Sequence, residues 1–297
     1  MNKEIYKKIY GLQKKIRYVE EKISSNYKDY LMRCPTHLSI GQESVASASG
    51  LALNKKDIAI SYHRSHAHYL AKGGSAKKLF AELHGYEEGC SKGIGGSMHL
   101  IDLKNNFYGS TAIVSNSIPV GVGLAYSLKI NKQKNLVCIY IGDAALEEGV
   151  FYESLNFCVI KKLPVVFVCE NNFYSVYTHI KDRQPQGRKL FKLAEAIGAK
   201  SNKFNQDNPY KLYLKFKNIF HKVRKNPYPH FIEIETYRYL EHCGPNDDTH
   251  LGYRTDKELK KWKKKDPLIY SRDFLMEKNL FDKSKINLLD KKIKNSV

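Results

Sequence analysis

The sequence predicts an α/β fold in which a parallel β-sheet carries helices on both faces. Short apolar runs rich in β-branched residues alternate along the chain with segments of helical spacing. Such runs are typical of strands buried on both sides, and their alternation with helices indicates βαβ units. The chain has 297 residues, of which 42% are apolar, so it can form a sizeable core and is not a disordered protein.

The predicted elements follow from local patterns taken in chain order. Apolar and charged positions alternate at helical spacing near the N-terminus, and small side chains further on indicate a closely packed helix. Helices are expected at 3–26, 41–54, 75–84, 118–129, 147–160 and 206–225, and a glycine-rich loop at 89–98. Buried strands are expected at 136–141, 164–169 and 230–236.

No repeat, low-complexity linker or clear domain boundary interrupts this pattern. From residue 255 onward apolar and lysine positions alternate at helical spacing. We therefore expect one domain at 1–267 and a C-terminal helical extension of the same domain at 268–297.

The formal net charge of +20 raises the question of a nucleic-acid ligand. Most of the basic residues are lysines, they are spread over the whole chain, and acidic residues lie among many of them. This pattern favours solvated helix faces over a nucleic-acid surface, because arginine makes most fork-shaped contacts to bases and phosphates. An acidic protein partner and a polyphosphate ligand also remain compatible with the charge.

Other global features concern the compartment. No apolar run is long enough to cross a bilayer, and the N-terminus lacks the apolar region of a secretory signal. The six cysteines include no CxxC pair, which favours reduced thiols over a disulfide framework or a zinc ribbon. We expect a cytoplasmic protein with no membrane contact.

Polar side chains follow two of the predicted strands at the point where each ends. Gly142 and Asp143 come after the first strand, and Asn172 follows the second. Because a right-handed crossover makes such strands parallel, both ends open at the same edge of the sheet, where α/β proteins bind ligands. A carboxylate, an amide oxygen and a backbone carbonyl are ligands that suit Mg²⁺. A Gly-Asp pair alone is a weak signal, since it ends many strands as a turn, but the pair of loops is a stronger one.

The segment 142–178, GDAALEEGVFYESLNFCVIKKLPVVFVCENNFYSVYT, resembles the thiamine-diphosphate-binding motif, Gly-Asp-Gly followed some thirty residues later by Asn-Asn. It is most similar to the alpha subunit of the decarboxylating component of 2-oxo acid dehydrogenase complexes, the pyruvate, branched-chain and acetoin dehydrogenase family. Further blocks agree: IGQES at 40–44, HRSHAHYLAKG at 63–73, CSKGIGGSMH at 90–99, TYRYLEHCG at 236–244 and GYRT at 252–255. The resemblance covers the chain to about residue 267 and implies a thiamine-diphosphate-binding fold.

The resemblance implies roles for individual residues. Asp143, Asn172 and the backbone carbonyl of Tyr174 match the Mg²⁺ ligands, and Arg64 and Arg238 match arginines that bind the diphosphate. The remaining cofactor-binding positions are His63, Ala112, Val114, Gly142, Ala144, Ala145 and His242. His242 matches an active-site histidine that donates a proton or binds substrate, and His66 matches a second histidine near the cofactor entrance.

Metal sites made of histidine are the rival interpretation. His63, His66 and His68 could be metal ligands by composition, but Arg64 among them favours a phosphate pocket, because a cation repels a metal ion. A second possible cluster consists of His242, Asp247, Asp248 and His250, where glycine and proline indicate a mobile loop. The glycines at 95–96 lack the Gly-Lys-Ser/Thr ending of a nucleotide-binding P-loop.

The sequence departs from the family pattern at several glycines. Ala144 replaces the last glycine of Gly-Asp-Gly, and Ser110-Thr111-Ala112-Ile113-Val114-Ser115 stands where the family has Gly-Asn-Gly-Ile-Val-Gly. These changes could weaken cofactor binding. Cys243 occupies the position of a regulatory serine, so control by phosphorylation there is not expected.

The resemblance further implies an activity and partners. An enzyme of this family uses thiamine diphosphate and Mg²⁺ to decarboxylate a 2-oxo acid or to act on an acetoin-type substrate, and passes the acyl group to a lipoyl-bearing acyltransferase component. It is active only with a beta subunit, in an α2β2 assembly. Two alternatives remain: the diphosphate-binding half of a split transketolase-type carboligase, which activity on ketose phosphates would reveal, and a non-catalytic scaffold homologue, which would not bind the cofactor.

Overall fold

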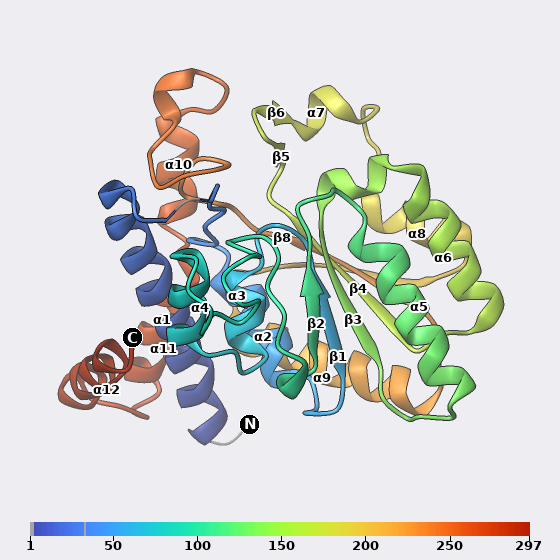
Figure 1. The fold of residues 1–297 in the computed structure, drawn as a ribbon, viewed down its shortest axis with the longest axis horizontal. Coiled ribbons are helices and arrows are strands. Elements are labelled where there is room, and N and C mark those ends of the chain that lie inside the picture. Colours follow the sequence, from blue (N-terminus) through green and yellow to red (C-terminus); the bar gives the residue numbers. More distant parts are fainter. Residues whose placement is uncertain (1–2, 33) are drawn as a thin grey trace.

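The computed structural model describes residues 3–32 and 34–297 and contains one six-stranded parallel sheet with helices on both faces (Figure 1). The strand order is β2-β1-β3-β4-β8-β7, and every neighbouring pair is parallel. The strands are β1 (Ile58–Ser61), β2 (Phe107–Ser110), β3 (Val137–Gly142), β4 (Val165–Asn171), β7 (Lys200–Asn205) and β8 (His230–Glu235). A separate antiparallel pair joins β5 (Tyr174–Ser175) to β6 (Thr178–His179).

Twelve helices lie between and around these strands in the described part of the chain. The first half contains α1 (Lys3–Asn26), α2 (Glu43–Ala52), α3 (His66–Ala71), α4 (Ala76–Leu83), α5 (Ser117–Ile130) and α6 (Gly149–Lys161). The second half contains α7 (Ile180–Arg183), α8 (Leu190–Ile197), α9 (Pro209–Lys225), α10 (Asp256–Lys263), α11 (Pro267–Glu277) and α12 (Lys283–Asn295).

The sheet separates two hydrophobic cores. On one face side chains of α1, α2, α4 and α9 pack against alternate residues of β3 and β4, such as Tyr140 and Val166. On the other face α5, α6 and α8 cover the intervening residues, such as Ile139 and Phe167. Both central strands are buried along almost their whole length, which explains why they are continuously apolar. Helix α5 lies so close to the sheet at Gly121 that a Cβ atom on this residue would be 2.6 Å from the Ile139 side chain. The lack of a side chain at Gly121 therefore permits this close packing.

The fold predicted from the sequence is confirmed, as are the three predicted strands and the predicted helices, with shifts of a few residues at their ends. Five strands were missed. β1 and β2 are only four residues long, β5 and β6 are only two, and β7 is a polar edge strand whose burial does not alternate, so none of them gives a clear apolar pattern.

The C-terminal helices α11 and α12 pack against α1, where Tyr10 joins Leu268, Leu275 and Ile286 in a small core. The division of the chain at residue 267 stays a prediction. All six cysteines are free thiols. Among the described residues, no helix has the length and apolar character needed to cross a membrane.

Candidate cofactor and active site

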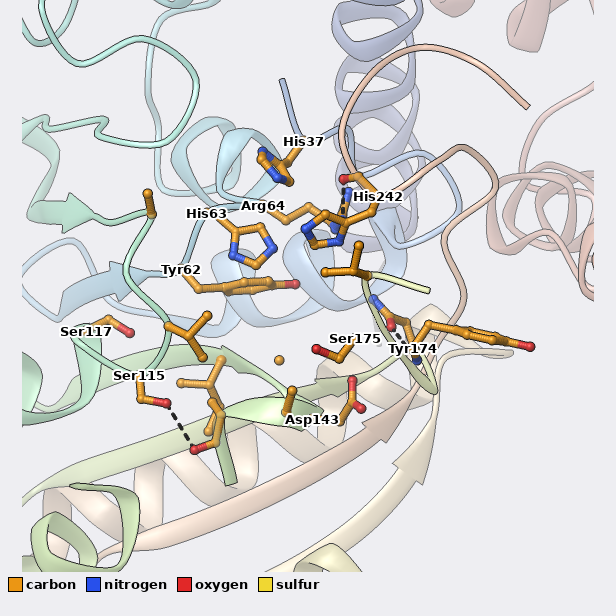
Figure 2. A pocket seen from close by; sticks show the side chains of 18 of the residues that line it. His37, Tyr62, His63, Arg64, Ser115, Ser117, Asp143, Tyr174, Ser175 and His242 are labelled. Atoms are coloured by element: carbon orange, nitrogen blue, oxygen red, sulfur yellow. Dashed lines mark hydrogen bonds between the residues drawn. The ribbon is translucent and has the colours of Figure 1, made fainter. Parts of the chain in front are cut away.

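A cavity opens at the carboxyl ends of β1, β3 and β4, the edge of the sheet that the sequence indicated (Figure 2). Chain segments that follow these strands line it, together with the loop that enters α5 and the loop after β8. The predicted site residues on its wall are His63, Arg64, Ala112, Val114, Gly142, Asp143, Ala144, Ala145, Asn172, Tyr174 and His242. These residues lie up to 179 positions apart in the sequence. The topology brings them together because each one follows a strand end or lies in a loop that leads to or from the sheet.

Oxygen donors gather at the junction of β3 and β4. These strands pair in register, with Gly142 opposite Glu170, so the chain leaves both strands at the same level and Asp143 and Asn172 both line the cavity. The side chains of Asp143 and Asn172 are buried, and the Asn172 Oδ1 atom accepts a hydrogen bond of 3.1 Å from the backbone N–H of Tyr174. Burial raises the pKa of Asp143, and the positive charge of Arg183 acts in the opposite direction. The donor set is made of hard oxygens and fits a divalent cation such as Mg²⁺.

Arg64 supplies buried positive charge on the opposite wall. Its Nη1 donates to the Leu38 carbonyl at 2.7 Å, and its Nη2 donates to the His242 carbonyl at 3.1 Å. The Nε atom is buried and has no hydrogen-bond partner among the described residues. Burial lowers the pKa of Arg64 to about 10, so the guanidinium is charged at neutral pH. An anion is the ligand that would satisfy this charge and the open donor.

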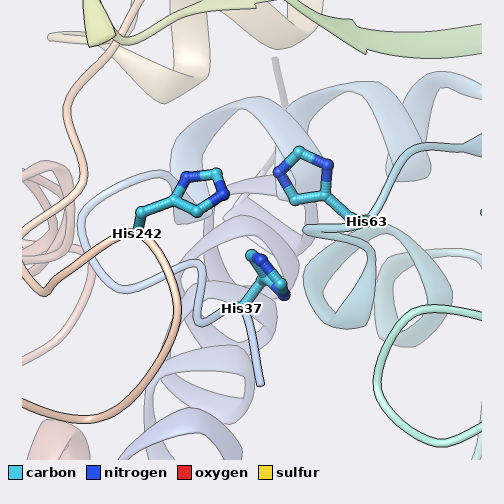
Figure 3. Close-up of side chains that lie close together, drawn as sticks. All are labelled: His37, His63 and His242. Atoms are coloured by element: carbon cyan, nitrogen blue, oxygen red, sulfur yellow. The ribbon is translucent and has the colours of Figure 1, made fainter. Parts of the chain in front are cut away.

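Three imidazoles, those of His37, His63 and His242, face one another (Figure 3), and Arg64 lies beside them (Figure 2). One ring nitrogen of each lies within 4.8 Å of the corresponding atoms of the other two. Burial, followed by the positive charge of Arg64, lowers the pKa of all three rings, that of His242 to about 3. The rings are therefore neutral at pH 7 and can both donate and accept hydrogen bonds. The positive charge of the neighbouring Arg64 guanidinium disfavours a metal ion here. The three rings are better suited to form hydrogen bonds with the oxygen atoms of an acid.

Two predicted site residues do not line the cavity. His66 is fully buried, and its ring nitrogens contact Glu20 at 3.1 Å and Ser97 at 2.8 Å. Arg238 lies behind the wall, where it donates to the Val176 carbonyl at 2.8 Å and pairs with Asp248 at 3.2 Å. In this structure both side chains contact other residues of the protein and not the cavity. Their direct contact with a cofactor stays a prediction.

The rival histidine metal sites do not converge in the described residues. His66 bonds to Glu20 and Ser97, whereas His68 bonds to Ser61 at 2.9 Å and lies 3.3 Å from a Glu170 oxygen. In the second cluster Asp248 pairs with Arg238 and Arg254, and Asp247 accepts hydrogen bonds from Thr249. Each carboxylate thus already has a partner that is not a metal ion.

Several cavity residues escaped the sequence analysis. The ring of Tyr62 forms part of the cavity wall, and its hydroxyl donates a hydrogen bond of 2.7 Å to Glu170, which fixes the orientation of the ring. The other residues missed are His37, Met98, Ser115, Ser117, Ile141, Ser175 and Val176. Tyr62, Ser115, Ile141 and Ser175 directly neighbour a predicted site residue and Val176 lies two positions from one, so extending each motif by one or two positions would have found these five. His37 lies in a loop with no such signal.

The replaced glycines differ in their backbone conformation. Ser115 has φ +65°, the left-handed region that favours glycine, and its side chain has to tolerate that conformation. Ala144 is not among the residues with positive φ, although it lines the cavity. The alanine in the Gly-Asp-Ala motif therefore introduces no backbone strain.

Comparison with known proteins identifies the family of the chain. The family model described as "Dehydrogenase E1 component" matches residues 13–297. The chain is 36% identical over 295 residues to the pyruvate dehydrogenase E1 component subunit alpha of Rickettsia bellii, covering 99% of this chain and 89% of that protein. It is 35% identical over 277 residues to the mitochondrial pyruvate dehydrogenase E1 component subunit alpha-1 of Arabidopsis thaliana, covering 91% and 70% of the two chains.

Proposed function

The chain belongs to the dehydrogenase E1 component family, as the alpha subunit of a thiamine-diphosphate-dependent 2-oxo acid dehydrogenase, and from this premise we propose that its substrate is pyruvate. The relatives it matches at 35–36% identity are named as pyruvate dehydrogenase subunits. The observation that carries the proposed thiamine-diphosphate-dependent activity is that Asp143 and Asn172 line one wall of the cavity and the Arg64 guanidinium lines the opposite wall.

The proposed cofactor arrangement uses both walls of this cavity. Asp143, Asn172 and the Tyr174 carbonyl would hold Mg²⁺, and Arg64, with its open Nε donor, would bind a diphosphate oxygen. Thiamine diphosphate, when bound, supplies the carbanion stabilisation that decarboxylation requires. The backbone at Ala112 and Val114 is available at the cavity wall for contacts to the cofactor ring.

The three neutral histidines are the groups of this chain that would bind the substrate and exchange protons with it. His37, His63 and His242 form one rim of the cavity, across from Asp143 (Figure 2). A neutral imidazole can donate one hydrogen bond to a carboxylate or keto oxygen and can hold a proton that moves during the reaction. Tyr62 forms part of the wall between the histidines and the loop at Ser115, and its buried ring limits the access of water.

A beta subunit would complete the site. Helix α5 is apolar around most of its circumference, and Val120, Tyr126 and Ile130 are exposed. The Tyr126 ring contacts the exposed Phe157 of α6 at 5.4 Å between centroids, so the apolar surface extends over both helices. Exposed Ile113 and Val114 lie in the loop that leads from the cavity into α5. An apolar surface of this kind is typical of a protein interface, and a partner on it would also cover the cavity.

We further propose an α2β2 assembly that transfers the acyl group to a lipoyl-bearing acyltransferase. The test is carried out on the complex purified from native cells through a tag on this chain. We expect a beta-type chain to co-purify, and pyruvate to be decarboxylated faster than branched-chain 2-oxo acids in the presence of Mg²⁺ and thiamine diphosphate. Lipoyl transfer is measured by adding the acyltransferase's lipoyl domain. Turnover of ketose phosphates instead would favour a transketolase-type carboligase.

Replacement of one metal ligand tests the site itself. Asp143→Asn removes the only carboxylate of the proposed metal set, and we expect both Mg²⁺-dependent cofactor binding and pyruvate decarboxylation to be lost. Glu277→Gln is the control, because this carboxylate is exposed on α11, away from the cavity and from the surface of α5 and α6. A complex in which Asp143→Asn binds thiamine diphosphate as well as the unmodified complex does would contradict the assignment.

A further inference from the structure

Arg183 occupies the place of a cation at the proposed metal site. It is the last residue of α7, and its guanidinium forms ion pairs with both Asp143 and Glu147. The pair is well shielded, with 10% of the Arg183 side chain and 3% of the Asp143 side chain exposed. Asp143 is thus neutralised by a side chain of its own subunit at the carboxylate that the proposed function assigns to Mg²⁺.

We propose that Arg183 is a built-in counterion that holds the metal site closed until a divalent cation and a diphosphate displace it. The inference rests on the proposed function, because it takes Asp143 to be a metal ligand. Arg183 is then a positioning residue, whose departure from Asp143 accompanies metal loading.

The charge at Asp143 explains why one cation should replace another. A carboxylate buried this deeply is destabilised in its charged form unless a positive group compensates it. Arg183 provides this compensation in the metal-free chain, and a divalent cation provides it in the loaded chain. Both together would place three positive charges next to one carboxylate, with only the half-exposed Glu147 and the incoming diphosphate to balance them.

The segment that carries Arg183 is attached to the cavity wall through strained backbone. Val176 has φ +53° and Phe173 has φ +70°, values that a β-branched or bulky residue rarely adopts. Between them lies β5, which pairs with β6 over only two residues. Strained residues of this kind persist where the surroundings hold them in place, and they cluster at ligand clamps and switch regions.

Side chains hold the segment down at one point. Besides the pairs made by Arg183, the Gln184 Nε2 atom donates to Glu147 at 2.8 Å, and the Arg183 Nε atom donates to the Thr178 carbonyl at 3.2 Å. Glu147 therefore anchors the segment, whereas Asp143 is the contact that a metal ion would take over. The two carboxylates can be tested separately.

The test measures Mn²⁺ binding by electron paramagnetic resonance in the metal-depleted α/β complex with thiamine diphosphate added. If the closed form makes up most of the population, its removal strengthens apparent affinity by the inverse of the open fraction. We expect Arg183→Gln to lower the apparent dissociation constant for Mn²⁺ on the order of tenfold. Glu147→Gln, which keeps the pair with Asp143, should lower it less. Lys181→Gln, an exposed cation on the same helix, is the control and should leave it unchanged.

A second readout follows the segment itself. Trp262 is the only tryptophan, and its ring lies 5.8 Å from the ring of Phe173 at the start of the segment. Metal binding to the unmodified chain should change its fluorescence, and Arg183→Gln should show the changed emission before metal is added. Equal or weaker Mn²⁺ binding by Arg183→Gln than by the unmodified complex would overturn the inference while leaving the metal site intact. Absence of Mn²⁺ binding in all variants, including the control, would overturn the proposed function and this inference together.

Discussion

The hydroxyl of Ser115 donates a hydrogen bond of 3.1 Å to the backbone oxygen of Ala145, and so joins two loops that line the same cavity. One loop leads into α5, and the other follows β3. Ser115 adopts a left-handed backbone conformation to make this contact, with φ +65°. The side chain that replaces the family's glycine thus both strains the backbone and supplies a hydrogen bond that glycine could not make.

Two substitutions at Ser115 separate these effects. Ser115→Ala keeps the strain and loses the hydrogen bond, so we expect it to lower the free energy of unfolding by about 1 kcal/mol. Ser115→Gly loses the same bond but relieves about 1 kcal/mol of left-handed strain, so it should be close to neutral. Urea unfolding of both variants measures the difference. An alanine variant as stable as the glycine variant would show that the backbone conformation at this position carries little strain.

Glu82 organises the glycine-rich loop at 89–98. Its two carboxylate oxygens accept backbone N–H groups at 2.6–3.1 Å, from Ser91, Gly93, Gly95 and Gly96. Glu82→Gln replaces one acceptor oxygen by a donor that faces N–H groups, and we expect it to lower the free energy of unfolding by about 3 kcal/mol. The measurement is urea unfolding, together with limited proteolysis to detect opening of the loop.

The control for this prediction is Glu87→Gln, an exposed carboxylate in the segment between α4 and the loop. We expect it to change the free energy of unfolding by less than about 0.5 kcal/mol. The loop is tied to the site, because Ser97 accepts a hydrogen bond from the His37 backbone and Met98 lines the cavity. If Glu82→Gln proved as mild as the control, the four contacts would not be what orders the loop.

The central part of the fold could be predicted because the residues that determine its strands are contiguous in the sequence. β3 and β4 are buried on both faces and therefore read as continuous apolar runs, and the crossover rule then places Asp143 beside Asn172 without any further information. The edge strand β7 could not be predicted in this way. Its residues, KSNKFN, are half solvated, so its place in the sheet depends on pairing with β8 rather than on a pattern of its own.

The parts of the site that escaped prediction depend on tertiary contacts. His37 reaches the cavity from a loop with no strand end to mark it, and it is recognised only by its distance from His63 and His242. Arg183 appears in the sequence as one cation in a polar segment, and nothing there indicates its pair with Asp143. Arg238 shows the opposite case, since a family motif identifies it but the fold places it behind Val176.

The three neutral histidines should make the protein sensitive to acid. Burial, followed by the positive charge of Arg64, lowers the pKa of His37, His63 and His242, that of His242 to about 3. Between these lowered pKa values and pH 6.5 the unfolded chain therefore binds more protons than the folded chain. Their contribution to stability is therefore fully present above pH 6.5 and is lost as the pH falls. Each ring contributes at most about 1.4 kcal/mol per pH unit.

Removing one ring tests this directly. The free energy of unfolding, measured between pH 5 and 6.5, should fall less steeply with decreasing pH in His63→Gln than in the unmodified chain, by up to about 1.4 kcal/mol per pH unit. His221→Gln is the control, because its exposed ring on α9 is hydrated in both states. A His63→Gln variant that retains the full pH dependence would mean that this ring is not held in its neutral form.

The exposed face of α5 is expected to determine whether the chain finds its partner. Val120→Lys places a charge in the apolar surface formed with Tyr126 and Phe157, where a partner would have to desolvate it. Central interface residues change the binding free energy by about 2 kcal/mol or more, which is a loss of affinity of roughly thirtyfold. The effect on the isolated chain should stay within about 0.5 kcal/mol, because Val120 is half exposed.

Leu214→Lys is the matched substitution on the other face of the sheet. Leu214 is as exposed as Val120, 48% against 49%, but it lies on α9, which packs with the opposite core. Co-purification of the partner should be reduced by Val120→Lys and unaffected by Leu214→Lys, and pyruvate decarboxylation should fall with the partner. Because a partner on α5 would also cover the cavity through Ile113 and Val114, added partner at high concentration should restore activity to Val120→Lys. Failure of that rescue, with the variant chain still folded, would place the interface elsewhere.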